Sequence, residues 1–310
     1  MVKEKIYPTL LIIIIWFSII SCGRKVYLFT SFHEPANAGL RMLYSYDGYH
    51  WKDFDTTFIK PEVGIQKVMR DPSIAQGPDG VFHFVWTSDW SGNNGFGYAS
   101  SADLIHWSKE EFIPVMKNEP SVVNVWAPEL FYDDVQKQFI IVWASTIPFR
   151  FEKGVEDEKN NHRLFYTTTP DFKTFSDAKL LYDPGFSSID AEIIKRKKDD
   201  YVMVLKDNTR PERDMKVAFA KSPLGPYSAA SKPFTENFTE GPTVAKVKGG
   251  YLVYYDAYKN KNFGAVFTKD FQTFKNADSL ISIPEGHKHG TVFMVKKKIL
   301  TDLLKQTNTH

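Results

Sequence analysis

The sequence predicts an all-β fold, a five-bladed β-propeller whose last blade is closed by strands from both ends of the chain. Three observations predict it. A strand-and-turn unit occurs five times, two further strand types precede it in a constant order, and one copy of a strand type is displaced to the C-terminal end. Repeats of about 40–50 residues that are built from strands are typical of propellers.

The recurring unit is a short alternating strand, a turn that contains Asp, Gly or Pro, and a terminal aromatic residue. Its copies are LYSYDGYHW (43–51), GYASSADLIHW (97–107), FYTTTPDFKTF (165–175), VAFAKSPLGPY (217–227) and GAVFTKDFQTF (264–274). A charged insert, FEKGVEDEKNNHR (151–163), lengthens the interval between the second and third copies. We expect this insert either to shape access to a binding site or to be a mobile loop.

A second strand type precedes each unit, at residues 25–32, 81–88, 138–145, 201–207 and 251–257. A third type precedes four of these, as DPSI (71–74), APEL (127–130), DAEI (190–193) and GPTV (241–244), and its fifth copy is HGTVFMV (289–295). We therefore expect residues 289–295 and 25–60 to share one blade, which removes an open sheet edge. A β-sandwich would predict neither the constant order nor the split blade.

Helical periodicity is not recognised after the first 22 residues, which argues against α/β folds. The chain has 310 residues, of which 43% are hydrophobic and 25% charged, as in folded globular proteins. We expect one propeller domain over residues 23–310. The formal net charge of +2 provides no basic field, so we expect no nucleic-acid partner.

The first 22 residues have the features of a secretory signal, with two early lysines followed by an apolar stretch. The ending Ile19-Ile20-Ser21-Cys22 resembles a bacterial lipobox, and Cys22 is the only cysteine in the chain. We expect lipidation at Cys22 and hence an exported bacterial lipoprotein anchored to a membrane of the cell envelope. It would lie at the outer membrane and face either the periplasm or the cell surface. The alternative is an ordinary cleaved signal with an incidental cysteine.

The third strand type carries the chemistry. Stacking its five copies places one residue of each in a single column: Asp71, Ala127, Asp190, Gly241 and His289. The residues before these are Arg70, Trp126, Ile189, Glu240 and Lys288. In a propeller this column surrounds the axis, so Asp71, Asp190 and Glu240 should meet at the mouth of one channel. Any one of these acids alone could simply be a solvent-exposed residue at a strand end, or a turn residue whose side chain caps its own backbone.

Three carboxylates in a small hollow repel one another, so their pKa values must separate. One protonated and one ionised carboxyl group are what glycoside hydrolysis requires.

The ordered motifs RDPSI, WAPEL, SIDAEI, TEGPTV and HGTVF resemble glycoside hydrolase family 43 and its clan of five-bladed propellers, over residues 26–296. The resemblance implies that Asp71 is the general base and Glu240 the general acid. Asp190 would orient the acid and raise its pKa. It also implies inversion, for which the base and acid carboxyl groups stand about 6.5–9.5 Å apart.

Residues around the acids supply further candidates. Trp126 is expected to form a wall of the sugar pocket, or else to pack within its blade. Arg70 is expected to bind a sugar or pair with an acid, and Trp90 to lie at the rim. Arg210 or Arg213 would either enter the pocket, as the resemblance implies, or remain at the surface.

No cofactor is expected for the chemistry itself. The resemblance implies a structural calcium ion near the propeller axis, beside His289; a hydrogen-bonded histidine at a strand end is the alternative.

The resemblance implies an oligo- or polysaccharide substrate. An exo-acting α-L-arabinofuranosidase is the favoured interpretation, because the chain retains Asp71 and has no added β-sandwich. The alternatives are a β-D-xylosidase, a galactosidase or galactan-active hydrolase, and a non-catalytic lipoprotein that captures glycans. A capture protein would be marked by the loss of one acid, and an interaction scaffold would leave the three acids unexplained.

Overall fold

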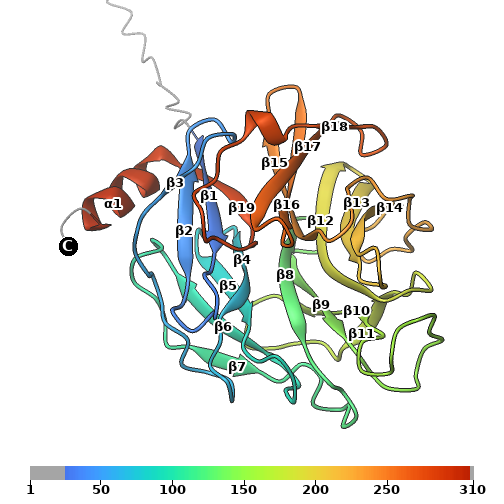
Figure 1. The fold of residues 1–310 in the computed structure, drawn as a ribbon. Helices are drawn as coiled ribbons and strands as arrows, with labels where there is room; N and C mark the ends of the chain where they lie inside the picture. The colour runs from blue at the N-terminus through green and yellow to red at the C-terminus, as the bar shows by residue number, and fades with distance from the viewer. Residues whose placement is uncertain (1–24, 308–310) are drawn as a thin grey trace, which may run out of the picture.

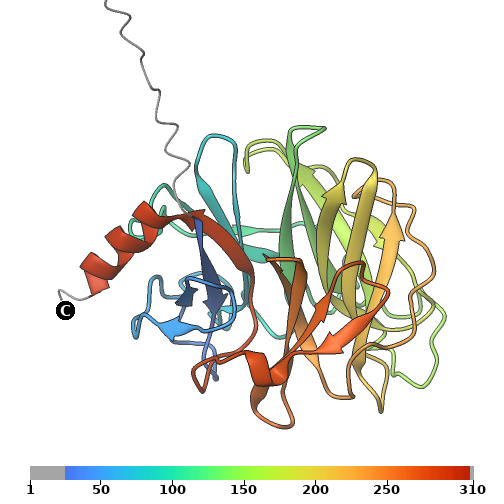
Figure 2. The same cartoon turned by 90° about the horizontal axis from the view of Figure 1, so that it is seen from above.

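Five antiparallel sheets surround a common centre in the computed structural model, which describes residues 25–307. The predicted five-bladed propeller is confirmed (Figure 1). The innermost strands of the five sheets lie next to the axis, and the later strands of each sheet follow outward (Figures 1 and 2). The predicted signal segment and Cys22 lie outside the described residues.

From the axis outward, the first blade contains β19 (Val292–Lys296), β1 (Lys25–Ser31), β2 (Arg41–Ser45) and β3 (Lys52–Asp53). The second contains β4 (Arg70–Gln76), β5 (Phe82–Thr87), β6 (Phe96–Ser101) and β7 (Glu111–Ile113). The third contains β8 (Trp126–Asp133), β9 (Gln138–Ser145), β10 (Arg163–Thr169) and β11 (Lys179–Tyr182). The fourth contains β12 (Ser188–Lys197), β13 (Asp200–Asp207) and β14 (Asp214–Ala220). The fifth contains β15 (Glu240–Val247), β16 (Gly250–Ala257), β17 (Asn262–Thr268) and β18 (Phe274–Asn276).

The first blade joins the two ends of the described chain, as predicted. Strand β19 pairs antiparallel with β1, with Val26 opposite Val295 and Phe29 opposite Val292. The pairing continues before β19, where the Thr30 N–H donates to the Thr291 carbonyl oxygen at 3.1 Å. The ring is therefore closed by backbone hydrogen bonds between segments more than 250 residues apart in sequence.

A helix near the C-terminus, α1 (Lys297–Thr307), follows β19 and was not indicated by the sequence pattern. Its side chains Leu300 and Leu303 are buried in a hydrophobic cluster with strand residues of the first two blades. The apolar residues of α1 share one face, but one 11-residue helix is too short for its period to stand out from the surrounding strands. A short 3-10 helix, η1 (Asp278–Leu280), follows β18. Among residues 25–307, no helix is long and apolar enough to span a membrane.

Four inner strands begin with the same β-bulge. In β4, β8, β12 and β15, two residues lie opposite one residue of the neighbouring strand. The first bulge residue has a positive φ in each case: Asp71 (50°), Ala127 (48°), Asp190 (50°) and Gly241 (58°). A bulge turns a side chain out of the regular alternation. Four of the five positions of the column found in the sequence are therefore equivalent bulge positions at the mouth of the axis; the fifth, His289, precedes β19.

Helix α1 should contribute measurably to stability. Leu303→Ala is expected to lower the free energy of unfolding by about 2–5 kcal/mol, because it leaves a cavity beside the core of the first blade. Urea denaturation followed by tryptophan fluorescence measures this change. The exposed Thr301→Ala on the same helix is the control and should change stability by less than about 0.5 kcal/mol. Equal stability of both variants would show that the helix does not support the propeller.

Candidate active site

A hollow at the mouth of the axis brings the predicted acids together. It measures about 400 Å³, open solvent at its mouth included. Its lining residues are Arg70, Asp71, Thr87, Trp90, Trp126, Ile189, Asp190, Glu240 and His289.

Asp71 is held in its ionised form by two donors. Its Oδ1 lies 2.9 Å from His289 Nε2, and its Oδ2 accepts a hydrogen bond of 2.7 Å from the Thr87 hydroxyl. Burial alone would raise the pKa of Asp71, but the hydrogen bond from His289 and the positive charges of His289 and Arg70 lower it to about 2. Asp71 is thus a carboxylate, able to accept a proton, throughout the neutral range.

His289 is fixed between two carboxylates. Its Nδ1 lies 3.6 Å from Asp256 Oδ2, on the side opposite Asp71. Burial opposes a charge on the ring, but interactions with Asp256 and Asp71 raise the pKa of His289 well above its ordinary value. Gly241 accommodates the ring, since a Cβ at that position would lie 2.0 Å from His289 Cγ.

Glu240 is paired with a lysine that sequence analysis did not identify. Lys206 Nζ donates to Glu240 Oε2 at 2.8 Å, and the Lys206 side chain is only 2% exposed. Burial would raise the pKa of Glu240, but the charges of Lys206 and His289 lower it. This corrects the expectation that Asp190 holds the pKa of the acid above its ordinary value. The neighbouring Asp190 has a raised pKa, mainly because of burial. Its Oδ2 accepts a hydrogen bond of 3.0 Å from the Gly241 N–H.

Lys206, Thr87 and Asp256 share a structural position that explains their role. Each is paired in register with the residue that precedes the bulge of its own blade, namely Ile189, Arg70 and Glu240. Lys206 and Asp256 each reach the next blade, where Lys206 contacts Glu240 and Asp256 contacts Lys288 at 3.1 Å. Thr87 also reaches the next blade, because its hydroxyl accepts from the Ala127 N–H at 2.8 Å.

A signal for these residues exists in the sequence. The second strand type ends in YVMVLKD (201–207) and YLVYYDA (251–257), so that Lys206 and Asp256 are charged residues at the end of apolar runs. A charge in such a place requires a partner.

Aromatic side chains form one wall of the hollow. The Trp126 indole N–H donates to the Trp90 carbonyl oxygen at 2.8 Å, and the two rings are nearly perpendicular. The Arg70 guanidinium lies over the Trp90 ring at 3.9 Å and also pairs with Glu34. Trp126 stacks on His162, with ring centroids 4.8 Å apart. His162 lies near the end of the charged insert (151–163), so this part of the insert supports the aromatic wall of the hollow.

The structure does not bring Arg210 and Arg213 into the hollow; neither is among the described residues that line it. Arg210 instead pairs with Glu156 of the insert, with Nε and Oε2 3.4 Å apart. Arg213 lies half-buried at the end of the same loop, with a φ of 53°.

The residues around His289 do not fit the calcium ion that the resemblance implied. Both ring nitrogens face carboxylates, and the ammonium groups of Lys206 and Lys288 already contact Glu240 and Asp256. Calcium takes six to eight oxygen ligands, and these carboxylates are already neutralised by side-chain cations.

An oxygen-rich set lies deeper on the axis and was missed by sequence analysis. Glu129 and Glu192 stand two residues after the bulge position of their strands and line a second, axial cavity. Burial raises the pKa of Glu129 to about 8, and burial together with the charge of Glu129 raises the pKa of Glu192. Thr291 Oγ1 donates to Glu129 at 3.0 Å. Each carboxyl group therefore binds a proton more tightly than the carboxyl group of a solvent-exposed glutamate does.

A family model and one curated relative match the sequence. The sequence model of a glycosyl hydrolase family related to family 43, described as "Probable glycosyl hydrolase domain", matches residues 24–300. An α-L-arabinofuranosidase of Bifidobacterium longum subsp. longum is 24% identical over 148 residues. That match covers 41% of this chain and only 14% of the relative's length.

Solved structures of glycoside hydrolases share the fold. An endo-arabinase from Bacteroides thetaiotaomicron superposes with a TM-score of 0.56 at 16% identity, covering 81% of this chain and 90% of the other. An α-L-arabinofuranosidase from Lactobacillus brevis gives a TM-score of 0.52 at 17% identity, covering 68% of this chain and 72% of the other.

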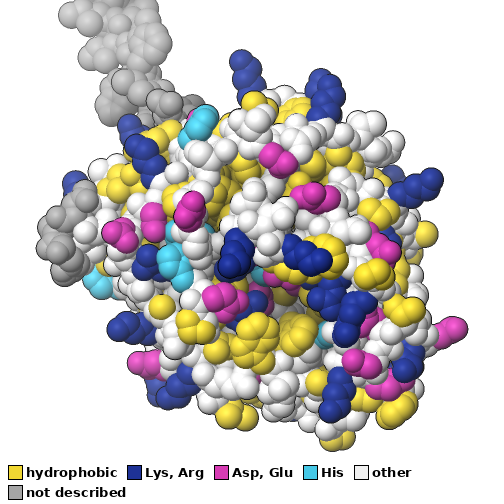
Figure 3. Space-filling model, in the orientation of Figure 1, with side chains coloured by type: hydrophobic (Ala, Val, Ile, Leu, Met, Phe, Trp, Pro, Cys, Tyr) yellow, Lys and Arg dark blue, Asp and Glu magenta, His cyan; other side chains and the backbone are white. Residues whose placement is uncertain are grey.

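Figure 3 shows basic and acidic side chains interspersed over one face, without a single large basic patch.

The pairing of Lys206 with Glu240 predicts a pH-dependent loss of stability. Lys206→Met leaves Glu240, whose side chain is 22% exposed, without its cation and should cost about 3 kcal/mol or somewhat less at neutral pH. Because the fold lowers the pKa of Glu240, the pair stabilises the protein above the ordinary pKa of a glutamate. This contribution is lost as the pH falls through the lowered value. Urea denaturation between pH 4 and pH 8 should therefore show the largest cost near neutrality.

The double variant Lys206→Met/Glu240→Gln is the control, since it removes both charges. It should recover much of the stability lost in Lys206→Met. A cost that is independent of pH, or no recovery in the double variant, would mean that lost packing rather than the ion pair explains the effect.

Proposed function

Because the chain belongs to the glycosyl hydrolase domain family related to glycoside hydrolase family 43, we propose that it is an inverting, exo-acting α-L-arabinofuranosidase. The chain is a glycosidase with the propeller fold, and the sugar and the stereochemistry are the proposed part. The observation that carries the proposal is the meeting of Asp71, Asp190 and Glu240 in one hollow. The pKa values of Asp71 and Glu240 are lowered there, and that of Asp190 is raised.

Asp71 serves as the general base. Its carboxylate stays ionised because His289 and Thr87 donate to it, so it can draw a proton from water as the water oxygen attacks the anomeric carbon. The imidazolium of His289 also lies 3.6 Å from Asp256, so two carboxylates hold the ring in place beside Asp71.

Glu240 serves as the general acid and donates its proton to the oxygen of the leaving group as the glycosidic bond breaks. The donated proton leaves a carboxylate, which Lys206 stabilises at 2.8 Å. Lys206 therefore makes Glu240 a stronger acid and also reduces its protonated fraction at neutral pH. An acidic pH optimum follows. Asp190, with its raised pKa and its bond to the Gly241 N–H, orients the segment that begins with Glu240.

The small hollow supports removal of a terminal sugar. Trp126 offers an aromatic face for the apolar side of a sugar ring, and Arg70 offers donors for its hydroxyl groups. Arabinofuranose is favoured because the matched curated relative is an α-L-arabinofuranosidase. β-D-Xylosidase and galactosidase activities are the alternatives within the same chemistry, and glycan capture without hydrolysis is the alternative outside it.

Leaving-group dependence tests the roles of the acids. Wild-type protein is assayed on aryl α-L-arabinofuranoside, β-D-xyloside and β-D-galactoside and on natural arabino-oligosaccharides. Glu240→Gln should lose about 10²–10⁴-fold in kcat/KM on the natural substrates, whose leaving groups need protonation. It should lose far less on an activated aryl glycoside. Asp71→Asn should lose activity on both, because water activation is needed for either substrate.

Glu236→Gln, an exposed glutamate just before β15, is the matched control and should behave like the wild type. Equal losses of Glu240→Gln on both substrates would remove Glu240 from the acid role, and Asp190→Asn would then be tested in the same way. Absence of hydrolysis of any substrate by the wild type, with measurable sugar binding, would favour a capture protein.

A further inference from the structure

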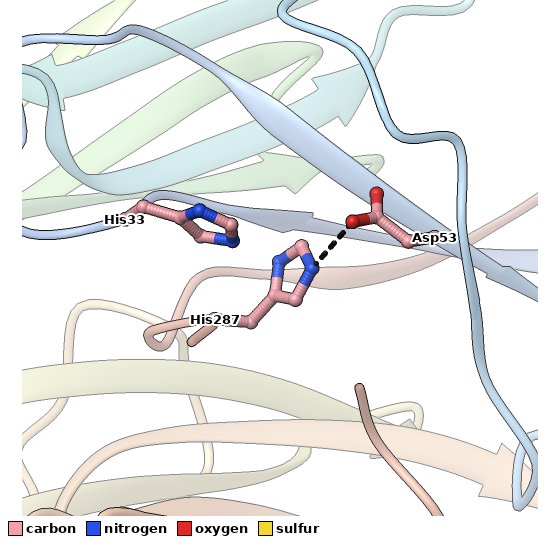
Figure 4. A group of neighbouring side chains, drawn as sticks. All are labelled: His33, Asp53 and His287. Carbon is pink, nitrogen blue, oxygen red and sulfur yellow. Dashed lines mark hydrogen bonds and ion pairs between the residues drawn. The ribbon is translucent and has the colours of Figure 1, made fainter. Parts of the chain in front are cut away.

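A second group of titratable side chains lies in the first blade, outside the hollow. His33 follows β1, Asp53 ends β3, and His287 belongs to the segment that leads to β19. Each offers one potential ligand atom, and these atoms lie within 4.8 Å of one another. The two imidazoles and the carboxylate face one another across a small gap (Figure 4).

The hydrogen bonds around His287 determine which of its nitrogens carries a proton. The Ser31 hydroxyl lies 2.8 Å from the Lys288 carbonyl oxygen, which can only accept, so the hydroxyl proton points there. Ser31 Oγ must then accept from His287 Nδ1 at 2.9 Å, which places a proton on Nδ1. The lone pair of a neutral His287 is therefore on Nε2.

His287 Nε2 lies 3.0 Å from Asp53 Oδ2, which is also an acceptor. Two acceptors at this distance need a cation between them, either a proton or a metal ion. The Arg41 guanidinium is 3.6 Å from the same carboxylate oxygen, so it offsets charge without filling the gap.

His33 supplies the observation that favours a metal ion. Its Nε2 is buried and has no hydrogen-bond partner among the described residues. Its ring stands nearly perpendicular to that of His287, with centroids 4.5 Å apart, and a ring nitrogen is directed toward the gap (Figure 4). A buried polar atom without a partner costs free energy, and a metal ion in the gap would satisfy it.

We propose that His33, Asp53 and His287 bind a divalent transition metal ion, with Zn²⁺ as the best fit. Two imidazoles and one carboxylate suit Zn²⁺, whereas Ca²⁺ and Mg²⁺ prefer oxygen ligands. Zinc ligands at about 2.0–2.1 Å in tetrahedral geometry stand about 3.4 Å apart. His287 Nε2 and Asp53 Oδ2, now 3.0 Å apart, would separate slightly, and atoms up to 4.8 Å apart would approach one another. Ser31 is the outer partner that fixes the tautomer of His287, a role common around zinc-bound histidines.

The site joins segments that also shape the hollow. Glu34, next to His33, pairs with Arg70 of the hollow. Lys288 and His289, just after His287, contact Asp256 and Asp71. A metal ion here would therefore connect the closure of the ring to the position of His289. It acts as a positioning device and takes no part in bond cleavage.

Titration of the chelator-treated protein with Zn²⁺ by calorimetry, and with Co²⁺ by visible absorption, tests the proposal. Wild-type protein should bind one ion at this site and show a rise in Tm with Zn²⁺. His33→Ala should weaken binding by more than the about 10–100-fold typical for loss of an outer partner, and Ser31→Ala by about that amount. His33→Ala breaks no hydrogen bond of His33 Nε2, so it should fold normally.

Two controls separate this site from others. His50→Ala removes an exposed histidine that pairs with Asp47 at 2.8 Å but has no second imidazole, and it should bind as the wild type does. Glu240→Gln alters the other described group with metal-ligand spacing, formed by Glu240, Asp256 and His289, and it should also retain binding. The absence of Zn²⁺ binding by wild type, equal binding by His33→Ala, or loss of binding in Glu240→Gln would overturn the proposal. Because binding is the readout, these outcomes do not depend on whether the protein hydrolyses arabinofuranosides.

Discussion

Buried carboxylates at the axis require cations, and this constraint determines the rest of the site. A buried charge without a partner costs several kcal/mol, on the order of 3–5 when one member of a pair is removed. Each ionised acid in the hollow has a cation close to it: Asp71 has His289, and Glu240 has Lys206. Asp256, which contacts His289, pairs with Lys288. Asp190, whose pKa is raised, has a backbone N–H instead. The protonation pattern of the site is thus a consequence of where the fold places its cations.

Most of these cations come from a different blade than the acid they neutralise. Lys206 crosses from the fourth blade to the fifth, and Asp256 of the fifth blade meets Lys288 and His289 of the closing segment. The last of these contacts forms only when β19 pairs with β1. Closure of the ring and assembly of the active site are therefore coupled. Pairing of β19 with β1 places His289 beside Asp71, and His289 then stabilises the Asp71 carboxylate. The group formed by His33, Asp53 and His287 lies at the same junction and would reinforce it.

Much of the fold was readable from the sequence because each blade repeats the same strand types. The repeated strand type placed Asp71 and Asp190 at equivalent positions, and its displaced copy at 289–295 predicted that both chain ends share the first blade. The sequence did not reveal the bulges, which depend on backbone φ values. It also did not reveal α1, because an amphipathic pattern of 11 residues is too short to recognise.

The partners of the acids were also missing from the sequence-based prediction. Lys206 and Asp256 are far from Glu240 and His289 along the chain, and their pairing depends on how one blade packs against the next. The Glu129 and Glu192 pair was overlooked because each looks like an ordinary strand residue until the axis brings the two together. Arg210, in contrast, was a plausible pocket residue in sequence, but the insert offers it Glu156 at the surface.

The anomeric configuration of the first-formed sugar tests the central claim most directly. Proton NMR during the first minutes of hydrolysis, before mutarotation, distinguishes the two anomers. If Asp71 acts as a general base on water, the released sugar has the configuration opposite to that of the substrate. Release with the substrate's own configuration would contradict this account, because it would require a carboxylate to attack the anomeric carbon and form a covalent intermediate.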